Sequence, residues 1–177
     1  MTYFAVALLR RAGTWSGREL DLDDIEDVAG LADALRDLDE AADVALALIE
    51  QDDEYCGIVR VEGTEDPRVF VSDERSRDVS RIAGLLLEET EPEPMLVADE
   101  AEDDGTDPAE DADGEDSHGT PDGPVPSGDA ELVADLGTTS DQLARLCEDA
   151  GVLPADVLSA VCENAGCLDE LEALRER

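Results

Sequence analysis

Four cysteines and one histidine are the side chains in this sequence that most readily bind metals or act as nucleophiles. They are Cys56, Cys147, Cys162, Cys167 and His118. A structural zinc site needs paired ligands at spacings such as Cys-x-x-Cys, and the closest pair here, Cys162 and Cys167, is spaced more widely. Cys147 and Cys162 fall at apolar helix positions, where a free cysteine packs as a small hydrophobic residue. We therefore expect four free thiols, no metal site and no cofactor.

Catalysis is not expected from this sequence either. His118 lies in an acidic stretch rich in Pro and Gly, where nothing would hold it against a nucleophile. Asp and Glu are abundant, but catalytic carboxylates need a shaped and partly desolvated pocket, which the sequence does not mark. Glycine-rich phosphate loops of the known patterns are absent from the sequence. We predict a protein that is not an enzyme and has no catalytic residues.

A few residues remain as candidates for contact with a partner. A Trp with a nearby Arg on an edge strand has the composition of an interface hot spot, although a Trp that closes one end of the core is the favoured alternative. Two arginines on the central hairpin lie near acidic turn residues, and such groups are often surface ion pairs of small energy. The candidate partner-binding residues are Trp15, Arg18, Arg60, Asp66, Arg68 and Phe70.

The hairpin that presents several of these candidates runs from Glu54 to Asp73. Valines alternate along both of its arms, at 59 and 61 and again at 69 and 71, as in strands with one buried face. The residues between Gly63 and Pro67 supply the turn. Ser72 is predicted to cap a helix whose apolar face contains Val79, Ile82, Ala83 and Leu86.

The elements before the hairpin complete a small sheet. Residues 2–10 and 43–50 are apolar on both faces, residues 14–20 form a shorter edge strand, and Asp27 caps a helix. The order β-β-α-β-β-β-α predicts an α+β fold, a small antiparallel sheet with two helices on one face. The second face then needs a cover from the C-terminal helices, a second copy or another protein, unless it is simply half buried. That face carries Phe4, Val6, Leu8, Ile58 and Phe70.

An acidic segment separates this domain, residues 1–90, from the C-terminal part. Residues 91–128 combine low hydrophobicity, one sign of charge and many Pro and Gly, which is typical of an extended, disordered linker. Met95-Leu96-Val97 interrupts the segment as either a short docking motif or an ordinary variation in linker composition. Residues 129–177 read as a small helical unit with a Thr139–Gln142 capping box, Pro154 opening a helix, and glycine stops at 137, 151 and 166. Because it is small, this unit is expected to dock on the first domain or on a partner.

The charge of the chain limits its partners. It has 49 acidic residues, 12 arginines and no lysine, a formal charge of -37. Direct nucleic-acid binding needs clustered basic residues and is therefore not expected. The charge favours a partner with a basic surface, while solubility or a high-salt or GC-rich source would explain it equally well. Without a secretory signal or an apolar run of membrane-spanning length, the protein is predicted to be cytoplasmic.

Three stretches resemble a known family. They are YFAVALLR at Tyr3–Arg10, W-x-G-R-E-L-D-L-D-D at Trp15–Asp24, and V-x-G-x-E-D-P-R-V-F-V-S-D at Val61–Asp73. The sequence is similar to the actinobacterial tRNA adenosine deaminase-associated proteins over the first ninety residues, and more loosely over residues 132–166. The resemblance implies an association with the zinc enzyme that makes wobble inosine, and it carries over no site residues. The chain is not that deaminase, because it lacks the paired H-x-E and P-C-x-x-C motifs.

The resulting expectation is a non-catalytic accessory or regulatory protein that contacts a tRNA adenosine deaminase or another basic protein. One alternative is a small-molecule-binding or enzymatic α+β domain, which requires a pocket with convergent polar groups between sheet and helices. Another is a homodimer that covers its own sheet face and has no contact with the deaminase.

Overall fold

The computed structural model describes residues 3–90, 123–149 and 151–177. Six strands form one antiparallel sheet in the order β2-β1-β3-β4-β5-β6. The strands are β1 (Tyr3–Arg11), β2 (Thr14–Glu19), β3 (Val44–Gln51), β4 (Tyr55–Val61), β5 (Arg68–Val71) and β6 (Ser127–Gly128). Both edges of the sheet are therefore short strands, and the long apolar strands lie at its centre.

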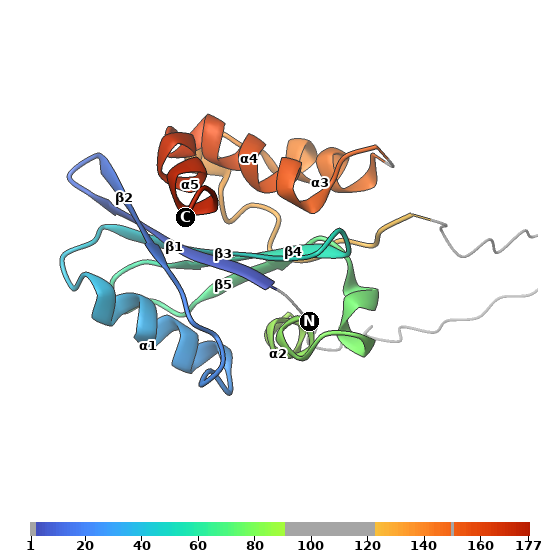
Figure 1. Cartoon of the computed structure of the whole chain (residues 1–177), viewed down its shortest axis with the longest axis horizontal. Coiled ribbons are helices and arrows are strands. Elements are labelled where there is room, and N and C mark those ends of the chain that lie inside the picture. The colour runs from blue at the N-terminus through green and yellow to red at the C-terminus, as the bar shows by residue number, and fades with distance from the viewer. Residues whose placement is uncertain (1–2, 91–122, 150) are drawn as a thin grey trace, which may run out of the picture.

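Helices cover both faces of the sheet, which gives three layers (Figure 1). One face carries α1 (Val28–Leu38) and α2 (Arg81–Glu89), preceded by the 3-10 turn η1 (Glu74–Asp78). The other face carries the 3-10 turn η2 (Ala134–Leu136) and the helices α3 (Ser140–Glu148), α4 (Pro154–Ala165) and α5 (Leu168–Arg175). The predicted α+β class and the order of its first seven elements are confirmed.

The first core lies between the sheet and the helices α1 and α2. Alternate residues of β1 and β3 point into it, because successive side chains of a strand point to opposite faces. The four hairpin valines lie in this core, against Leu31 and Leu35 of α1 and Leu86 of α2. The period-two pattern of the hairpin therefore identified the correct buried face.

The second core lies between the sheet and the C-terminal helices. Val6, Leu8, Ile58 and Phe70 are all almost fully buried there, and Phe4 packs at its margin. The helices supply Leu143, Val157, Leu158, Val161 and Leu171. Of the covers that the sequence left open for this face, the structure has the C-terminal helices of the same chain. An exposed apolar sheet face is thus not available to recruit a partner.

The predicted helix start after the hairpin was wrong. Ser72 continues the sheet, with its N–H bonded to the Cys56 carbonyl at 2.9 Å and its hydroxyl accepting the Cys56 N–H at 2.9 Å. Asp73 caps η1, and Ser80 caps α2 by accepting the Ala83 N–H at 3.2 Å. Val79 lies at the junction of these two elements, half exposed rather than on the buried face of a single helix.

Other local signals are confirmed by the structure. Asp27 caps α1 through the Gly30 N–H at 2.6 Å, and Thr139 and Gln142 form the reciprocal capping box of α3. Pro154 is the first residue of α4, and Gly166 ends that helix with a φ of +78°. These short motifs fix where the C-terminal helices begin and end, and hence which faces they turn toward the sheet.

Most of the acidic segment lies outside the residues that the structure describes. Three predictions concern that part of the chain: the disorder of the segment, the role of Met95-Leu96-Val97 and the setting of His118. Within its last part, Ser127 and Gly128 pair with Val71 and Phe70 as the edge strand β6. The division into residues 1–90, 91–128 and 129–177 stays a prediction. In the described segments no helix has the length and apolar character that a membrane crossing requires.

Candidate functional site

Trp15 lies in the contact between the sheet and the C-terminal helices. Its side chain is buried in the second core, and its indole Nε1 donates to the Ala165 carbonyl at 3.0 Å. Arg10, the cross-strand neighbour of Trp15, places its guanidinium 5.8 Å from the ring centroid. Trp15 thus joins β2 to the end of α4.

Arg60 is buried, with 4% of its side chain exposed, although it is charged. Its Nη1 donates to the Leu132 carbonyl at 2.6 Å, and its Nη2 donates to Asp135 at 2.9 Å. Glu62, the residue directly after β4, is a further partner. Hydrogen bonding to Arg60 lowers the pKa of Asp135, and the same bond raises the pKa of Arg60. The guanidinium therefore fixes the first turns of the C-terminal part to the sheet.

Arg68 lies directly opposite Arg60 on the neighbouring strand β5. Its Nε donates to Asp129 at 2.6 Å, in a pair whose two side chains are about 40% exposed. Burial opposes ionisation of Asp129, but the hydrogen bonds from Arg68 and the Glu131 N–H outweigh it and lower its pKa. Two like charges face each other across the hairpin, and besides Glu62, the carboxylates that compensate them come from residues 129–135.

The six predicted contact residues therefore divide by location. Phe70 of β5 and Trp15 of β2 are both buried in the second core, with three strands between them. Arg60 and Arg68 bind the C-terminal segment. Arg18 and Asp66 are exposed and far apart in the sheet order, Arg18 on the edge strand β2 and Asp66 in the turn between β4 and β5. A role in binding a partner stays a prediction for this set.

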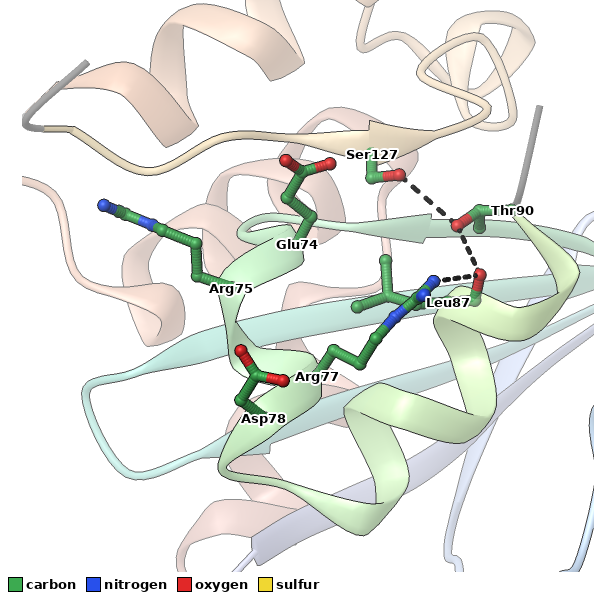
Figure 2. Close-up of a pocket in the computed structure, with 7 residues that line it drawn as sticks. All are labelled: Glu74, Arg75, Arg77, Asp78, Leu87, Thr90 and Ser127. Carbon is green, nitrogen blue, oxygen red and sulfur yellow. Dashed lines mark hydrogen bonds between the residues drawn. The ribbon is translucent and has the colours of Figure 1, made fainter. Parts of the chain in front are cut away.

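Figure 2 shows a hollow beside Thr90 and Ser127. The described chain stops at Thr90 and resumes at Gly123. The Thr90 and Ser127 hydroxyls lie 3.3 Å apart, and both residues line a surface hollow of about 490 Å³. Because α2 ends here and β6 begins here, the two ends of the acidic segment are held at one edge of the molecule.

Two arginines line this hollow and hold its walls together. Arg75 donates to Asp73 and to the Gly123 carbonyl, the latter at 2.7 Å, and Arg77 donates to the Leu87 carbonyl at 3.0 Å near the end of α2 (Figure 2). Asp73 also accepts the Val125 N–H at 3.3 Å. Burial alone would raise the pKa of Asp73, but these donors lower it. These polar contacts hold residues 123–128, where the described chain resumes, against η1 and α2, and we call them the clamp.

All four cysteines are free, buried thiols in the second core. Burial raises the pKa of Cys56 and of Cys147 to about 12. The hydrogen bond with Cys167, together with burial, also raises the pKa of Cys162. Thiols held in the protonated form are poor nucleophiles and poor metal ligands. In the described residues, no group of three or more Cys, His, Asp or Glu side chains could hold a metal ion.

Most of the arginines are committed to contacts within the chain. In the described part of the structure, nine of the 12 bind a carboxylate, a backbone carbonyl or an aromatic ring. Arg18, Arg145 and Arg177 have no such partner among the described residues. Arg18 is one of the candidate residues predicted from the sequence. Arg145 is not, because in the sequence an arginine on the polar face of α3 looks like any other solvent-facing helix residue.

Several contact residues were missed from the sequence. Asp129 and Asp135 compensate the hairpin arginines, and Arg175 of α5 donates to Glu50 of β3 at 2.7 Å while it lies over the Phe4 ring. One signal was present: Arg60 and Arg68 both lie on the predicted hairpin, where the structure pairs them, so nearby acidic residues were required. Which of 49 acids would supply them could not be read from local patterns.

These features define a small acidic α+β protein in which the C-terminal helices complete a single antiparallel sheet. The family model described as Rv3753c-like tRNA adenosine deaminase-associated protein matches residues 3–168, and the chain belongs to that family. The family expected from the sequence motifs is thus confirmed. No curated protein and no solved structure gives a significant match.

Proposed function

We propose that this chain is an accessory protein that binds a tRNA adenosine deaminase and acts through that contact, without a reaction of its own. Membership of the deaminase-associated family over residues 3–168 is the observation that carries the proposal. The family description links its members to the deaminase, and it ascribes no chemistry to them.

The charge of the chain supports a protein partner with a basic surface. An enzyme that binds tRNA must present basic residues to the phosphate backbone. A chain of formal charge -37 is attracted to such a surface, and the attraction raises the association rate and weakens with salt. The same charge repels tRNA itself, so contact with the enzyme is favoured over contact with its substrate.

In the described part of the chain, the four cysteines and the two hairpin arginines serve the fold, which supports a non-catalytic role. The thiols are buried and protonated, and Arg60 and Arg68 tie the C-terminal part to the sheet. Apolar side chains fill the layers on both sides of the sheet. The rival interpretation requires a small-molecule site between sheet and helices, and among the described residues a hollow of about 290 Å³ lies between α1 and the sheet at the margin of the first core.

In one form of the proposal, the acidic segment competes with tRNA for the basic surface of the deaminase. Residues 91–122 carry 14 acidic residues and no Arg or Lys. Such a polyanion would inhibit inosine formation at low salt, and the inhibition would fade as salt rises because counterions screen both partners. Salt-independent inhibition would rule out this form while leaving the association itself intact.

Calorimetric titration of the purified chain into the deaminase from the same source tests the association. We expect a saturable heat with micromolar or tighter affinity at about 50 mM salt, and weaker binding at about 200 mM. The matched control is titration into the same enzyme already saturated with tRNA. Absence of binding at both salt concentrations would reject the proposal.

A second experiment isolates the acidic segment in an inosine-formation assay. Replacing every Asp by Asn and every Glu by Gln between 91 and 122 keeps its length and leaves Thr90 and the clamp on residues 123–128 untouched. Deleting residues 88–128 would instead remove Thr90 and β6, both of which pack on the fold. If the competition form holds, the amide variant binds the deaminase but no longer inhibits it at low salt.

A further inference from the structure

A groove runs between α3 and α4 on the outer side of the C-terminal layer. Its volume is about 330 Å³, within the range of sites that hold small groups or side chains. Apolar walls come from Leu146, Val152 and Ala160. The polar groups at its margin come from Gln142, Arg145, Asp149 and Asn164. Leu146 and Val152 pack on the second core from the outside, so the groove floor is continuous with a rigid part of the protein.

One exposed apolar residue directly follows the lining residue Val152 in the sequence. Leu153, next to Val152 and at the cap of α4, leaves 47% of its surface exposed. Among the described residues, Val79 at 50% is the other large hydrophobic residue exposed to this extent, and it lies beside α2 on the opposite face of the sheet. A half-exposed leucine beside an apolar groove marks a contact surface more strongly than an isolated exposed residue does.

The charges around the groove favour a basic occupant. Glu148, Asp149 and Glu163 are exposed on its helices or at their ends. Arg145 is the basic residue of the lining, and it has no ion-pair partner among the described residues. The lining itself carries one acidic and one basic residue, Asp149 and Arg145. The two helices together with Asp149 carry five acidic residues and one Arg, so the surroundings of the groove are net acidic, as the whole chain is. A second copy would bring the same acidic surroundings and the same overall charge, so self-association through this groove is opposed.

We propose that the α3–α4 groove is where the deaminase docks, by inserting apolar side chains from a segment that is flanked by basic residues. The inference rests on the proposed function and assigns the surface for it. Apolar side chains enter between Leu146, Val152 and Ala160 and cover Leu153, while basic residues on either side meet Glu148, Asp149 and Glu163. This is the arrangement by which an amphipathic segment binds a groove between two helices.

Two variants change the groove in different ways. Leu153→Asp removes an exposed apolar contact, and Ala160→Phe fills the groove; the first position is open enough that the fold should tolerate the change. Each should weaken deaminase binding by roughly tenfold or more in calorimetry, as for a central interface contact. Val79→Asp is the matched control, an equally exposed apolar residue on the other face, and should leave the dissociation constant within about twofold.

A third variant reports the charge of the occupant. Arg145→Glu should tighten binding to a basic segment, whereas it would weaken binding to an acidic one, including the acidic segment of this chain. Weaker binding by Arg145→Glu would therefore overturn the assignment of a basic occupant. If wild type binds the deaminase but Leu153→Asp and Ala160→Phe bind equally well, the groove is not the docking site and the association stands. If wild type does not bind, both proposals fail.

Discussion

At the residue scale, opposite faces of one hairpin carry different kinds of residue pair. Valines at 59 and 69 pair on the first core, and the arginines at 60 and 68 pair on the side of the C-terminal segment. Like charges in direct cross-strand pairs are unfavourable, so each arginine depends on its own aspartate. The environments differ, because Arg60 is buried and Arg68 is about 40% exposed.

The two arginines should therefore differ in their effect on stability. Arg60→Ala removes the donor to the Leu132 carbonyl and to Asp135 and should lower the free energy of unfolding by about 2–4 kcal/mol. Arg68→Ala, the matched control across the hairpin, breaks an exposed pair and should cost less than about 1 kcal/mol. Urea unfolding of both variants measures the difference. Equal costs would show that burial does not distinguish them.

The buried thiols predict a loss of stability at alkaline pH. In the folded protein the pKa of Cys56 and of Cys147 is raised to about 12, whereas an unfolded thiol ionises near pH 8.5. Their contribution is complete below the unfolded pKa and is lost as pH rises toward the folded pKa, by roughly 1–2 kcal/mol per thiol at pH 10. Urea midpoints between pH 8 and pH 10 should fall, and Cys147→Ala should fall less steeply than wild type. An unchanged slope in Cys147→Ala would contradict this origin.

At the element scale, the shortest strand is β6, which lies where the C-terminal part of the chain meets the sheet. β6 consists of Ser127 and Gly128, and Gly128 has a φ of +98°. A Cβ at that position would lie 2.3 Å from the Val69 carbonyl oxygen. Glycine is therefore required for the chain to lie against β5 at this edge.

Gly128→Ala should destabilise the protein by roughly 1–3 kcal/mol, because the backbone must leave its conformation or push β5 away. Gly123→Ala is the control in the same returning segment, since a Cβ there meets nothing within 4 Å and its cost should stay within about 0.5 kcal/mol. Thermal unfolding of both variants tests the prediction. A neutral Gly128→Ala would mean that β6 pairing adds little to stability.

Local signals were sufficient for most of the elements. The alternating valines, Asp27, the Thr139–Gln142 box and Gly166 each act within a few residues and each predicted its element correctly. Ser72 misled because a serine after a strand can prolong the ladder as well as cap a helix. The candidate site was less accessible, since Arg60 meets Asp135 and Trp15 meets Ala165 across 75 and 150 residues. The groove of Leu146, Val152 and Ala160 likewise depends on how two helices pack.

At the scale of the whole molecule, one sheet is shared by two cores. The strands bury one face against α1 and α2 and the other against α3, α4 and α5 (Figure 1). The same strands line both cores, so disrupting the packing of one core also disturbs the strands that line the other core. The N-terminal and C-terminal parts should therefore unfold together, although a long acidic segment joins them.

Trp15 provides the test of this cooperativity, because it is the single Trp and its indole binds the C-terminal carbonyl of Ala165. Its fluorescence and the far-ultraviolet circular dichroism of the helices should give the same urea midpoint. A fluorescence change that comes before the loss of helix would show that the C-terminal helices detach first.

The mass in solution, measured by light scattering for the chain alone and mixed with the deaminase from the same source, tests the central claim most directly. The account predicts a monomer of 18.9 kDa alone, because the second sheet face is already covered, and a larger species that contains both proteins in the mixture. That species should dissociate in part as salt rises. A dimer of the chain together with an unchanged deaminase mass would contradict the account and favour self-association.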